Sequence, residues 1–271
     1  MNTVSDFNEI KNKVIIITGC SGNLGGEYAR FLLESGATIF GIDRVEESTI
    51  IELKYKFKNN FYFFNGDITS KKSMLEALKA CKENFKKIDV LINNAAIDSP
   101  PNSTSNENCK FENFSLETWD KVMEVNLKGA FICSQVFGTE MSINNGGSII
   151  NISSIYGILS PDQSLYDYMK DDGIEFFKPI AYSVSKSGIM NMTRYLAVYW
   201  AKKNVRVNTL TIAGVENNQD PRFIRNYTNR IPIGKMANKK DYNGAILFLS
   251  TSASTYMTGS NLVIDGGWSS I

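Results

Sequence analysis

The stretch Lys13-Val-Ile-Ile-Ile-Thr-Gly-Cys-Ser-Gly-Asn-Leu-Gly-Gly26 decides the fold of this chain. Its β-branched opening, Lys13–Thr18, predicts a strand that is buried on both faces, as strands of parallel sheets are. The residues from Asn23 to Ser35 predict a helix, which Gly36 ends as its cap. Glycines between a strand and a helix let the backbone approach a phosphate, which then rests on the helix N-terminus. The opening of the chain therefore predicts a phosphate-binding turn.

The alternation of strand and helix continues along the chain. Further strands are predicted at Thr38–Ile42, Asn60–Phe64, Ile88–Ile92, Ser148–Ile152, Val205–Leu210 and Asn261–Ile264, and helices at Ser70–Phe85, Trp119–Thr139, Tyr182–Lys202 and Lys239–Ser250. Right-handed crossovers join such elements into a parallel sheet. The sequence therefore predicts an α/β fold, a doubly wound, Rossmann-like parallel sheet of about seven strands with helices on both faces.

Two segments interrupt this rhythm. Asp98–Asn113 is polar and contains Pro100-Pro101, and Ile158–Pro179 has no clear period, so both are predicted to be loops. We predict one domain over residues 1–271, with an inserted substrate loop at about 158–179. Long loops at strand ends commonly carry specificity.

The composition excludes several classes of function. The chain has 29 basic and 28 acidic residues, so it lacks the positive field that nucleic-acid binding needs. It has no histidine, which removes histidine-based triads and histidine-ligated metals. The four cysteines, Cys20, Cys81, Cys109 and Cys133, have no CxxC spacing, so we expect no metal site.

The hydropathy pattern gives no sign of a membrane. No apolar stretch approaches the roughly 20 residues of a membrane-spanning helix, and the N-terminal residues lack the apolar core of a signal peptide. We therefore expect a cytoplasmic protein whose partner is a small-molecule substrate.

Asp43 follows the second predicted strand, 43 − 19 = 24 residues after Gly19. A carboxylate at this place accepts hydrogen bonds from the adenosine ribose hydroxyls and repels a 2′-phosphate. The sequence therefore favours NAD over NADP. NADP stays open, because the neighbouring Arg44 could pair with a 2′-phosphate.

Further motifs carry a resemblance to a known family. They are Asn93-Asn-Ala-Ala96, Ile152-Ser-Ser154, Tyr182-Ser-Val-Ser-Lys186, Val205-Arg-Val-Asn208 and Asp265-Gly-Gly267. Together with the glycine-rich turn they resemble the short-chain dehydrogenase/reductase family, from about Lys13 to Gly267. The glycine spacing also fits the extended branch of that family, and Asn23 stands where the compact branch has glycine. Asparagine tolerates a positive φ better than most residues, and the other motifs and the chain length resemble the compact branch, which we favour.

The resemblance implies a cofactor site. The pyrophosphate would lie along the turn, at Gly19, Ser21, Gly22, Asn23, Leu24 and Gly25. The adenosine would contact Asp43, Arg44, Asp67 and Ile68. Asn94 and Ala95 would lie near the nicotinamide ribose, and further cofactor contacts would be Ala96, Ile152, Tyr182, Lys186, Val215 and Asn217. The family's Pro-Gly after the sixth strand is absent, and Val215 would offer its backbone to the carboxamide.

Tyr182 and Lys186 are four residues apart, so on a helix their side chains share one face. A nearby positive charge lowers the pKa of a phenol from ~10 and so activates it. In the family this tyrosine exchanges a proton with the substrate oxygen while hydride moves between nicotinamide and carbon. The resemblance adds Ser154, on the substrate oxygen, and Asn126, in the proton relay. The predicted catalytic residues are therefore Asn126, Ser154, Tyr182 and Lys186.

Tyr166 and Lys170 form a second pair with the same spacing. This pair follows Ser154 by 166 − 154 = 12 residues, close to the usual gap in the family, whereas Tyr182 follows it by 182 − 154 = 28. We assign Tyr182, because Lys186 leads into a long helix and Asp171-Asp172-Gly173 after Lys170 ends one.

The resemblance implies interconversion of a secondary alcohol and a ketone. The inserted segment, Lys178-Pro179 and Val215–Gln219 resemble the flagellin-modification protein A subgroup, which suggests a sugar or amino-sugar substrate of surface-glycan biosynthesis. Two alternatives stay open: an NADPH-dependent 3-oxoacyl carrier-protein reductase, and a non-catalytic dinucleotide-binding regulatory protein. Members of the family are usually tetramers, so we expect a homo-oligomer, either a tetramer or a dimer.

Overall fold

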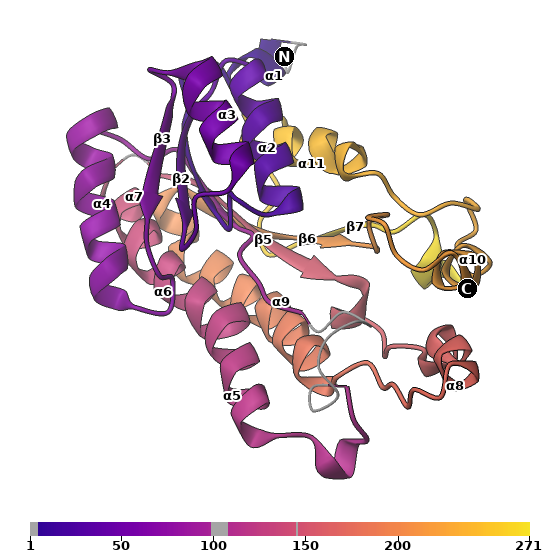
Figure 1. The fold of residues 1–271 in the computed structure, drawn as a ribbon. Helices are drawn as coiled ribbons and strands as arrows, with labels where there is room; N and C mark the ends of the chain where they lie inside the picture. Colours follow the sequence, from indigo (N-terminus) through magenta and orange to yellow (C-terminus); the bar gives the residue numbers. More distant parts are fainter. Residues whose placement is uncertain (1–4, 99–107, 145) are drawn as a thin grey trace.

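The computed structural model describes residues 5–98, 108–144 and 146–271. Their strands form one seven-stranded sheet in the order β3-β2-β1-β4-β5-β6-β7, in which every neighbouring pair is parallel (Figure 1). The strands are β1 (Val14–Thr18), β2 (Thr38–Asp43), β3 (Phe61–Asn65), β4 (Val90–Asn93), β5 (Gly147–Ser154), β6 (Val205–Ile212) and β7 (Asn261–Ile264). The prediction of a doubly wound α/β fold is confirmed.

Helices cover both faces of the sheet (Figure 1). Those packed on one face are α2 (Asn23–Glu34), α3 (Ser48–Phe57) and α11 (Asn243–Ser250). Those packed on the other are α4 (Lys71–Phe85), α6 (Ala130–Cys133), α7 (Thr139–Ile143) and α9 (Ile180–Trp200). Ile15 and Ile17 of β1 join the first core and Ile16 the second, which explains why this central strand is apolar throughout.

Helical structure differs from the prediction at several places. The helix predicted over Trp119–Thr139 begins earlier, as α5 (Leu116–Met123), and extends to the end of α7. Two π-helical turns interrupt it, at Glu124–Gly129 and Ser134–Gly138. Helices α3 and α10 (Pro221–Thr228) were not predicted.

A small lobe stands beyond the carboxyl ends of β5 and β6. It contains α10 and two short helical segments of the 158–179 region, a 3₁₀ turn at Gln163–Tyr166 and α8 (Tyr168–Asp171), where a loop was predicted (Figure 1). Arg222 of α10 bonds the carboxylates of Asp172 and Asp220, and Arg230 pairs with Asp162. These contacts fix the 158–179 segment to α10.

The lobe has a core of its own. Its buried side chains are Ile155, Tyr156, Leu165, Tyr166, Met169, Phe176, Ala213, Phe223, Tyr227, Ile231, Met236 and Trp268.

The other predicted loop, Asp98–Asn113, lies mostly outside the described residues, which omit 99–107. Among the described helices, none is both long and apolar enough to span a bilayer. The remaining helix, α1 (Ser5–Asn8), is a single short turn.

Candidate active site

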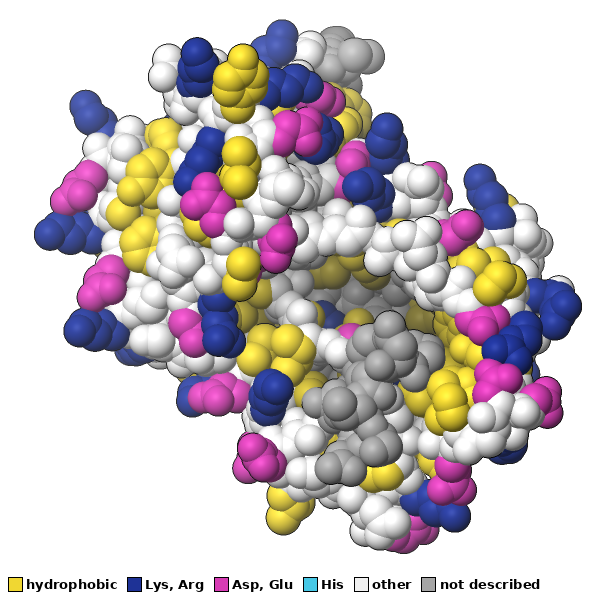
Figure 2. All heavy atoms as spheres, viewed as in Figure 1, with side chains coloured by type: hydrophobic (Ala, Val, Ile, Leu, Met, Phe, Trp, Pro, Cys, Tyr) yellow, Lys and Arg dark blue, Asp and Glu magenta, His cyan; other side chains and the backbone are white. Residues whose placement is uncertain are grey.

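A cleft of about 610 Å³ opens at the carboxyl ends of the central strands. It lies where the strand order reverses between β1 and β4, which is the place where doubly wound sheets bind their ligands. The space-filling view shows this part of the surface hollowed between the sheet and the small lobe (Figure 2). Every predicted site residue except Ser21 and Asn126 lines the cleft.

The glycine-rich turn is compact on its inner side and open on its outer side. Gly19 has a φ of +69°, and a Cβ on it would lie 2.7 Å from Cα of Ala95. A Cβ on Gly25 would lie 2.1 Å from the carbonyl oxygen of Gly19, so neither position tolerates a side chain. A Cβ on Gly22, in contrast, would meet only the carbonyl oxygen of Gly19, at 3.4 Å.

Gly22 is also the N-cap of α2, and no side chain caps this helix. The first N–H groups of α2 therefore point into the cleft without a side-chain partner, as a bound pyrophosphate requires. Asn23 begins the helix with ordinary helical geometry, since it is not among the residues with positive φ. Asn23 therefore fits this position without adopting a positive φ.

Asp43 ends β2 and presents its carboxylate to the cleft. One oxygen accepts the N–H of Ser21 at 3.0 Å and the other the N–H of Arg44 at 2.7 Å. Ser21 thus lies behind Asp43 and holds it, instead of lining the cleft. These bonds fix the orientation of the carboxylate at the cleft.

Asp67 and Ile68 lie on the same side of the cleft as Asp43. Burial opposes the charge of Asp67, but the N–H and hydroxyl of Thr69, at 2.9 and 2.8 Å, and the charge of Arg44 hold the pKa of this carboxyl below its ordinary value. Asp67 is therefore ionised at neutral pH.

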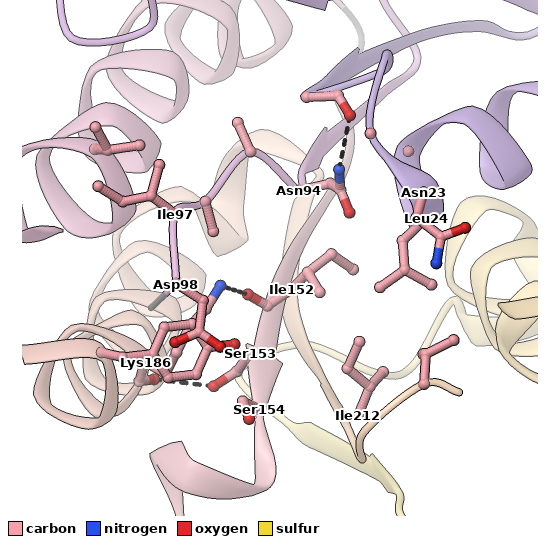
Figure 3. Close-up of a pocket in the computed structure, with 18 of the residues that line it drawn as sticks. Asn23, Leu24, Asn94, Ile97, Asp98, Ile152, Ser153, Ser154, Lys186 and Ile212 are labelled. Atoms are coloured by element: carbon pink, nitrogen blue, oxygen red, sulfur yellow. Dashed lines mark hydrogen bonds between the residues drawn. The ribbon is translucent and has the colours of Figure 1, made fainter. Parts of the chain in front are cut away.

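Asn94 connects β4 to the glycine-rich turn. Its amide donates to the carbonyl oxygens of Thr18 and Gly19 at 3.0 and 3.2 Å, so its side chain supports the turn (Figure 3). Across the cleft, the carbonyl oxygen of Val215 accepts a hydrogen bond from Gln219 at 2.8 Å. The other predicted lining residues here are Ala95, Ala96 and Asn217.

Tyr182 and Lys186 lie on the first turns of α9 and meet Ser154 at the end of β5. Lys186 Nζ donates to the carbonyl oxygen of Ile152 at 3.0 Å and lies 5.7 Å from the centroid of the Tyr182 ring (Figure 3). A hydrogen bond joins the side chains of Tyr182 and Ser154. The three groups thus converge at the inner end of the cleft, as the sequence predicted.

The pKa shifts of the tyrosine–lysine pair differ from the prediction. Burial and the charge of Asp98 raise the pKa of Tyr182, against the hydrogen bond from Ser154. Burial also lowers the pKa of Lys186 to about 8, which the charge of Asp98 partly opposes. The predicted lowering of the Tyr182 pKa is therefore wrong for this structure, because the cost of burying the phenolate dominates.

Asn126 lies in the first π-helical turn and does not line the cleft. Its side chain accepts the N–H of Ile97 at 2.8 Å and donates to the carbonyl oxygen of Ile97 at 3.0 Å and to Ser185 Oγ at 3.1 Å. Ser185 Oγ in turn donates to the carbonyl oxygen of Tyr182 at 2.7 Å. The side chain of Asn126 therefore connects α9 to the chain after β4.

The second tyrosine–lysine pair does not converge. Tyr166 is 4 % exposed and packs its ring on Phe176 and Phe223, with centroids 4.4 and 5.5 Å away. Lys170 is exposed and pairs with Asp167. Tyr166 therefore has no lysine beside it, and the geometry favours Tyr182.

Sequence reasoning did not assign several polar residues of the cleft to the site, and three of them lie together. Asp98 and Lys178 form an ion pair in it, and Tyr156 lies beside them. The two charged residues are 178 − 98 = 80 positions apart, and no motif connects them. Only the fold brings them together.

Among the described residues, no cluster of three or more cysteine and acidic side chains could hold a metal ion. Cys20, Cys81 and Cys133 are buried and free, and burial raises the pKa of the Cys81 thiol to about 12. Cys109 is partly exposed. We assign no chemistry to these thiols.

A doubly wound parallel sheet with a glycine-rich turn at its switch point and a tyrosine–lysine pair beside it defines a Rossmann-type oxidoreductase. A family model described as "Enoyl-(Acyl carrier protein) reductase" matches residues 19–269. The chain belongs to the short-chain dehydrogenase/reductase family and is an enzyme of it, which confirms the resemblance predicted from the motifs.

Several named proteins are similar over almost their whole length. The 2-dehydro-3-deoxy-D-gluconate 5-dehydrogenase of Escherichia coli is 31% identical, with 96% of each chain covered. The NAD-dependent glycerol dehydrogenase of Listeria innocua is 30% identical (97% of this chain and 96% of that one). The post-translational flagellin modification protein A of Campylobacter coli is 29% identical (96% and 99%).

Solved structures agree with the fold and contain both dinucleotides. A short-chain dehydrogenase from Leptospira borgpetersenii with bound NAD+ is 32% identical with a TM-score of 0.85, over 99% of this chain and 97% of that one. A gluconate 5-dehydrogenase from Burkholderia cenocepacia in complex with NADP and tartrate is 25% identical with a TM-score of 0.83 (99% and 100%). Relatives thus bind NAD or NADP.

Proposed function

We propose that this enzyme interconverts a secondary alcohol and a ketone with NAD(H), on a sugar or amino-sugar derivative of surface-glycan biosynthesis. The observation that carries the proposal is one continuous cleft with Asp43 and the open glycine-rich turn at one end and Ser154, Tyr182 and Lys186 at the other. The oriented carboxylate of Asp43 supports NAD over NADP.

The residues at the inner end of the cleft have different roles toward the substrate oxygen. A bound nicotinamide would supply or accept the hydride. Ser154 and Tyr182 hydrogen-bond the oxygen of the substrate, and Tyr182, which its raised pKa keeps protonated, donates its proton when a ketone is reduced. The ammonium of Lys186 then stabilises the phenolate that is left.

The names of relatives support a polyhydroxylated substrate. Proteins similar to this chain are named for deoxygluconate, glycerol and gluconate. The link to surface glycans depends on the similarity to flagellin modification protein A. We also propose a homo-oligomer, which the exposed apolar side chains Tyr195, Val198 and Tyr199 of α9 support.

A dinucleotide titration tests the cofactor site. We expect NADH to bind at least about tenfold more tightly than NADPH, and Asp43→Ala to weaken NADH roughly 10- to 100-fold, which corresponds to the loss of charge-assisted hydrogen bonds. Quenching of protein fluorescence measures both dissociation constants. Glu46→Ala, which removes an exposed carboxylate outside the cleft, serves as control and should leave both constants unchanged.

Equal or tighter binding of NADPH would instead show that Arg44 dominates, and would favour the carrier-protein reductase alternative. If neither dinucleotide bound to the wild-type protein, the proposed function would be wrong.

The pKa of Lys186 predicts how the rate depends on pH. This lysine is charged below about pH 8 and neutral above it. Because its charge stabilises the Tyr182 phenolate that ketone reduction leaves behind, we expect kcat/KM for reduction to fall as the pH rises through about 8. A profile measured from pH 6 to 10 checks this, and a constant rate up to pH 10 would contradict it.

A further inference from the structure

The cleft contains a buried cation that the proposed chemistry does not use. The side chain of Lys178 is 5% exposed, and its Nζ lies 2.6 Å from both carboxylate oxygens of Asp98. The same Nζ lies 5.3 Å from the centroid of the Tyr182 ring. A buried lysine this close to the reacting group is expensive to desolvate, and its pairing with Asp98 offsets that cost.

Asp98 is the more exposed partner of the pair, with 42% of its side chain accessible. Its charge acts on several groups of the centre, because it raises the pKa of both Tyr182 and Lys186. Figure 3 shows Asp98 on the same side of the cleft as Lys186 and Ser154. The accessible edge of this carboxylate therefore lies in the same cleft as Tyr182 and Lys186.

Tyr156 adds a second, independent observation. It is 8% exposed and lines the cleft, and its hydroxyl accepts a hydrogen bond from Tyr166, but within the described part of the chain its own proton has no acceptor. Burial raises its pKa to about 12, so the hydroxyl stays protonated and can donate. A buried hydroxyl whose proton has no acceptor is uncommon, and an acceptor atom of a bound ligand would complete it.

We propose that Asp98, Lys178 and Tyr156 form a subsite for the hydroxyl groups of an uncharged, polyhydroxylated substrate. This inference rests on the proposed function and narrows its substrate class. The ion pair presents an acceptor next to a donor, so one hydroxyl donates to Asp98 and its vicinal neighbour accepts from Lys178. Tyr156 donates to a third oxygen.

The same pair disfavours an anionic substrate. Lys178 and Asp98 offset each other's charge through two short contacts, so the pair itself carries no net charge. A substrate carboxylate would be repelled by Asp98 and would have to displace it from Lys178. This chain should therefore differ in charge preference from similar proteins that are named for gluconates.

The test compares matched probes on the full chain with NAD+. D-Glucitol represents C4–C6 polyols, and D-gluconate represents their aldonates. The two probes share hydroxyl groups and differ by one carboxylate. The third probe, 2-butanol, represents an alcohol without further hydroxyls. We expect kcat/KM of the wild-type enzyme to be at least about tenfold higher for the polyol D-glucitol than for D-gluconate or 2-butanol.

Two variants change the charge of the subsite in opposite directions. Asp98→Asn removes the negative charge beside Lys178, so the aldonate-to-polyol ratio of kcat/KM should rise about tenfold or more. Lys178→Met removes the positive charge beside Asp98, so the ratio should fall. In both variants KM for polyols should rise about 10- to 100-fold, while KM for 2-butanol changes less than about threefold. The charge of Asp98 also acts on Tyr182 and Lys186, so kcat shifts by a similar factor on all probes and the ratio remains the readout. Asp167→Asn, in the exposed pair with Lys170, is the control and should change none of these values.

A merely structural ion pair predicts a different result, since both variants would then lower the rates on all three probes together and leave the ratio unchanged. That result would overturn the subsite, as would a wild-type preference for aldonates or turnover of 2-butanol without any polyol. A failure of the proposed function itself is distinguishable, because then neither NAD(H) binding nor oxidation of any probe would be observed.

Discussion

Tyr182→Phe is expected to lower kcat by about 10²- to 10⁴-fold, which is the range that a general acid–base group contributes. The substitution removes the hydroxyl that bonds Ser154 and keeps the ring over which Lys178 and Lys186 lie. The dissociation constant of NADH should therefore change less than about threefold. Steady-state rates together with a fluorescence titration separate these two effects.

Tyr166→Phe is the matched control. Tyr166 also lines the cleft and is also followed by a lysine four residues later, but that lysine faces solvent and pairs with Asp167. We expect a change in kcat of less than about tenfold. If Tyr166→Phe abolished turnover and Tyr182→Phe did not, the assignment of the catalytic tyrosine would be reversed.

The strands of this protein were predictable because a parallel sheet buries both faces. The run in Val14–Thr18 is apolar for that reason, and all seven predicted strands overlap the observed ones. The missed helices carried weaker signals. In α3, Ile50 and Leu53 are spaced for one buried helix face, and α10 begins with Asp220 as a capping residue followed by Pro221.

The residues of the site likewise include some that the sequence predicts and some that it does not. Residues within one turn or helix, such as Gly19, Tyr182 and Lys186, could be predicted, because their spacing alone brings them together. The pair of Asp98 and Lys178 joins the end of a strand to a segment 80 positions later (178 − 98), so no local pattern indicates it. The pKa of Tyr182 was wrongly predicted, because burial is a property of the packed lobe and not of the YxxxK spacing.

Lys186→Met is expected to lower kcat/KM about 10²- to 10³-fold, since it removes the charge that stabilises the Tyr182 phenolate. The fall in reduction rate near pH 8 should disappear with it, because Lys186 is the group that we expect to titrate there. Lys170→Met, at the exposed lysine of the second pair, is the control and should retain activity and the pH profile.

The same substitution should stabilise the protein without dinucleotide. The pKa of Lys186 is lowered from 10.5 to about 8, so below pH 8 the folded state carries a buried charge that the unfolded chain holds more easily. That shift corresponds to an upper limit of roughly 3 kcal/mol, which disappears as the pH rises from about 8 to 10.5. Loss of the hydrogen bond to Ile152 offsets about 1 kcal/mol.

We therefore expect Lys186→Met to raise the free energy of unfolding by about 1–2 kcal/mol at pH 7 and to give no gain at pH 10.5. Denaturant unfolding at the two pH values measures this difference. A higher free energy of unfolding at pH 7 combined with lost turnover would mean that the fold tolerates a destabilising buried charge at this position because catalysis requires it. A loss of stability at pH 7 would mean that Lys186 is paired well enough to support the fold and that its buried charge does not destabilise the protein.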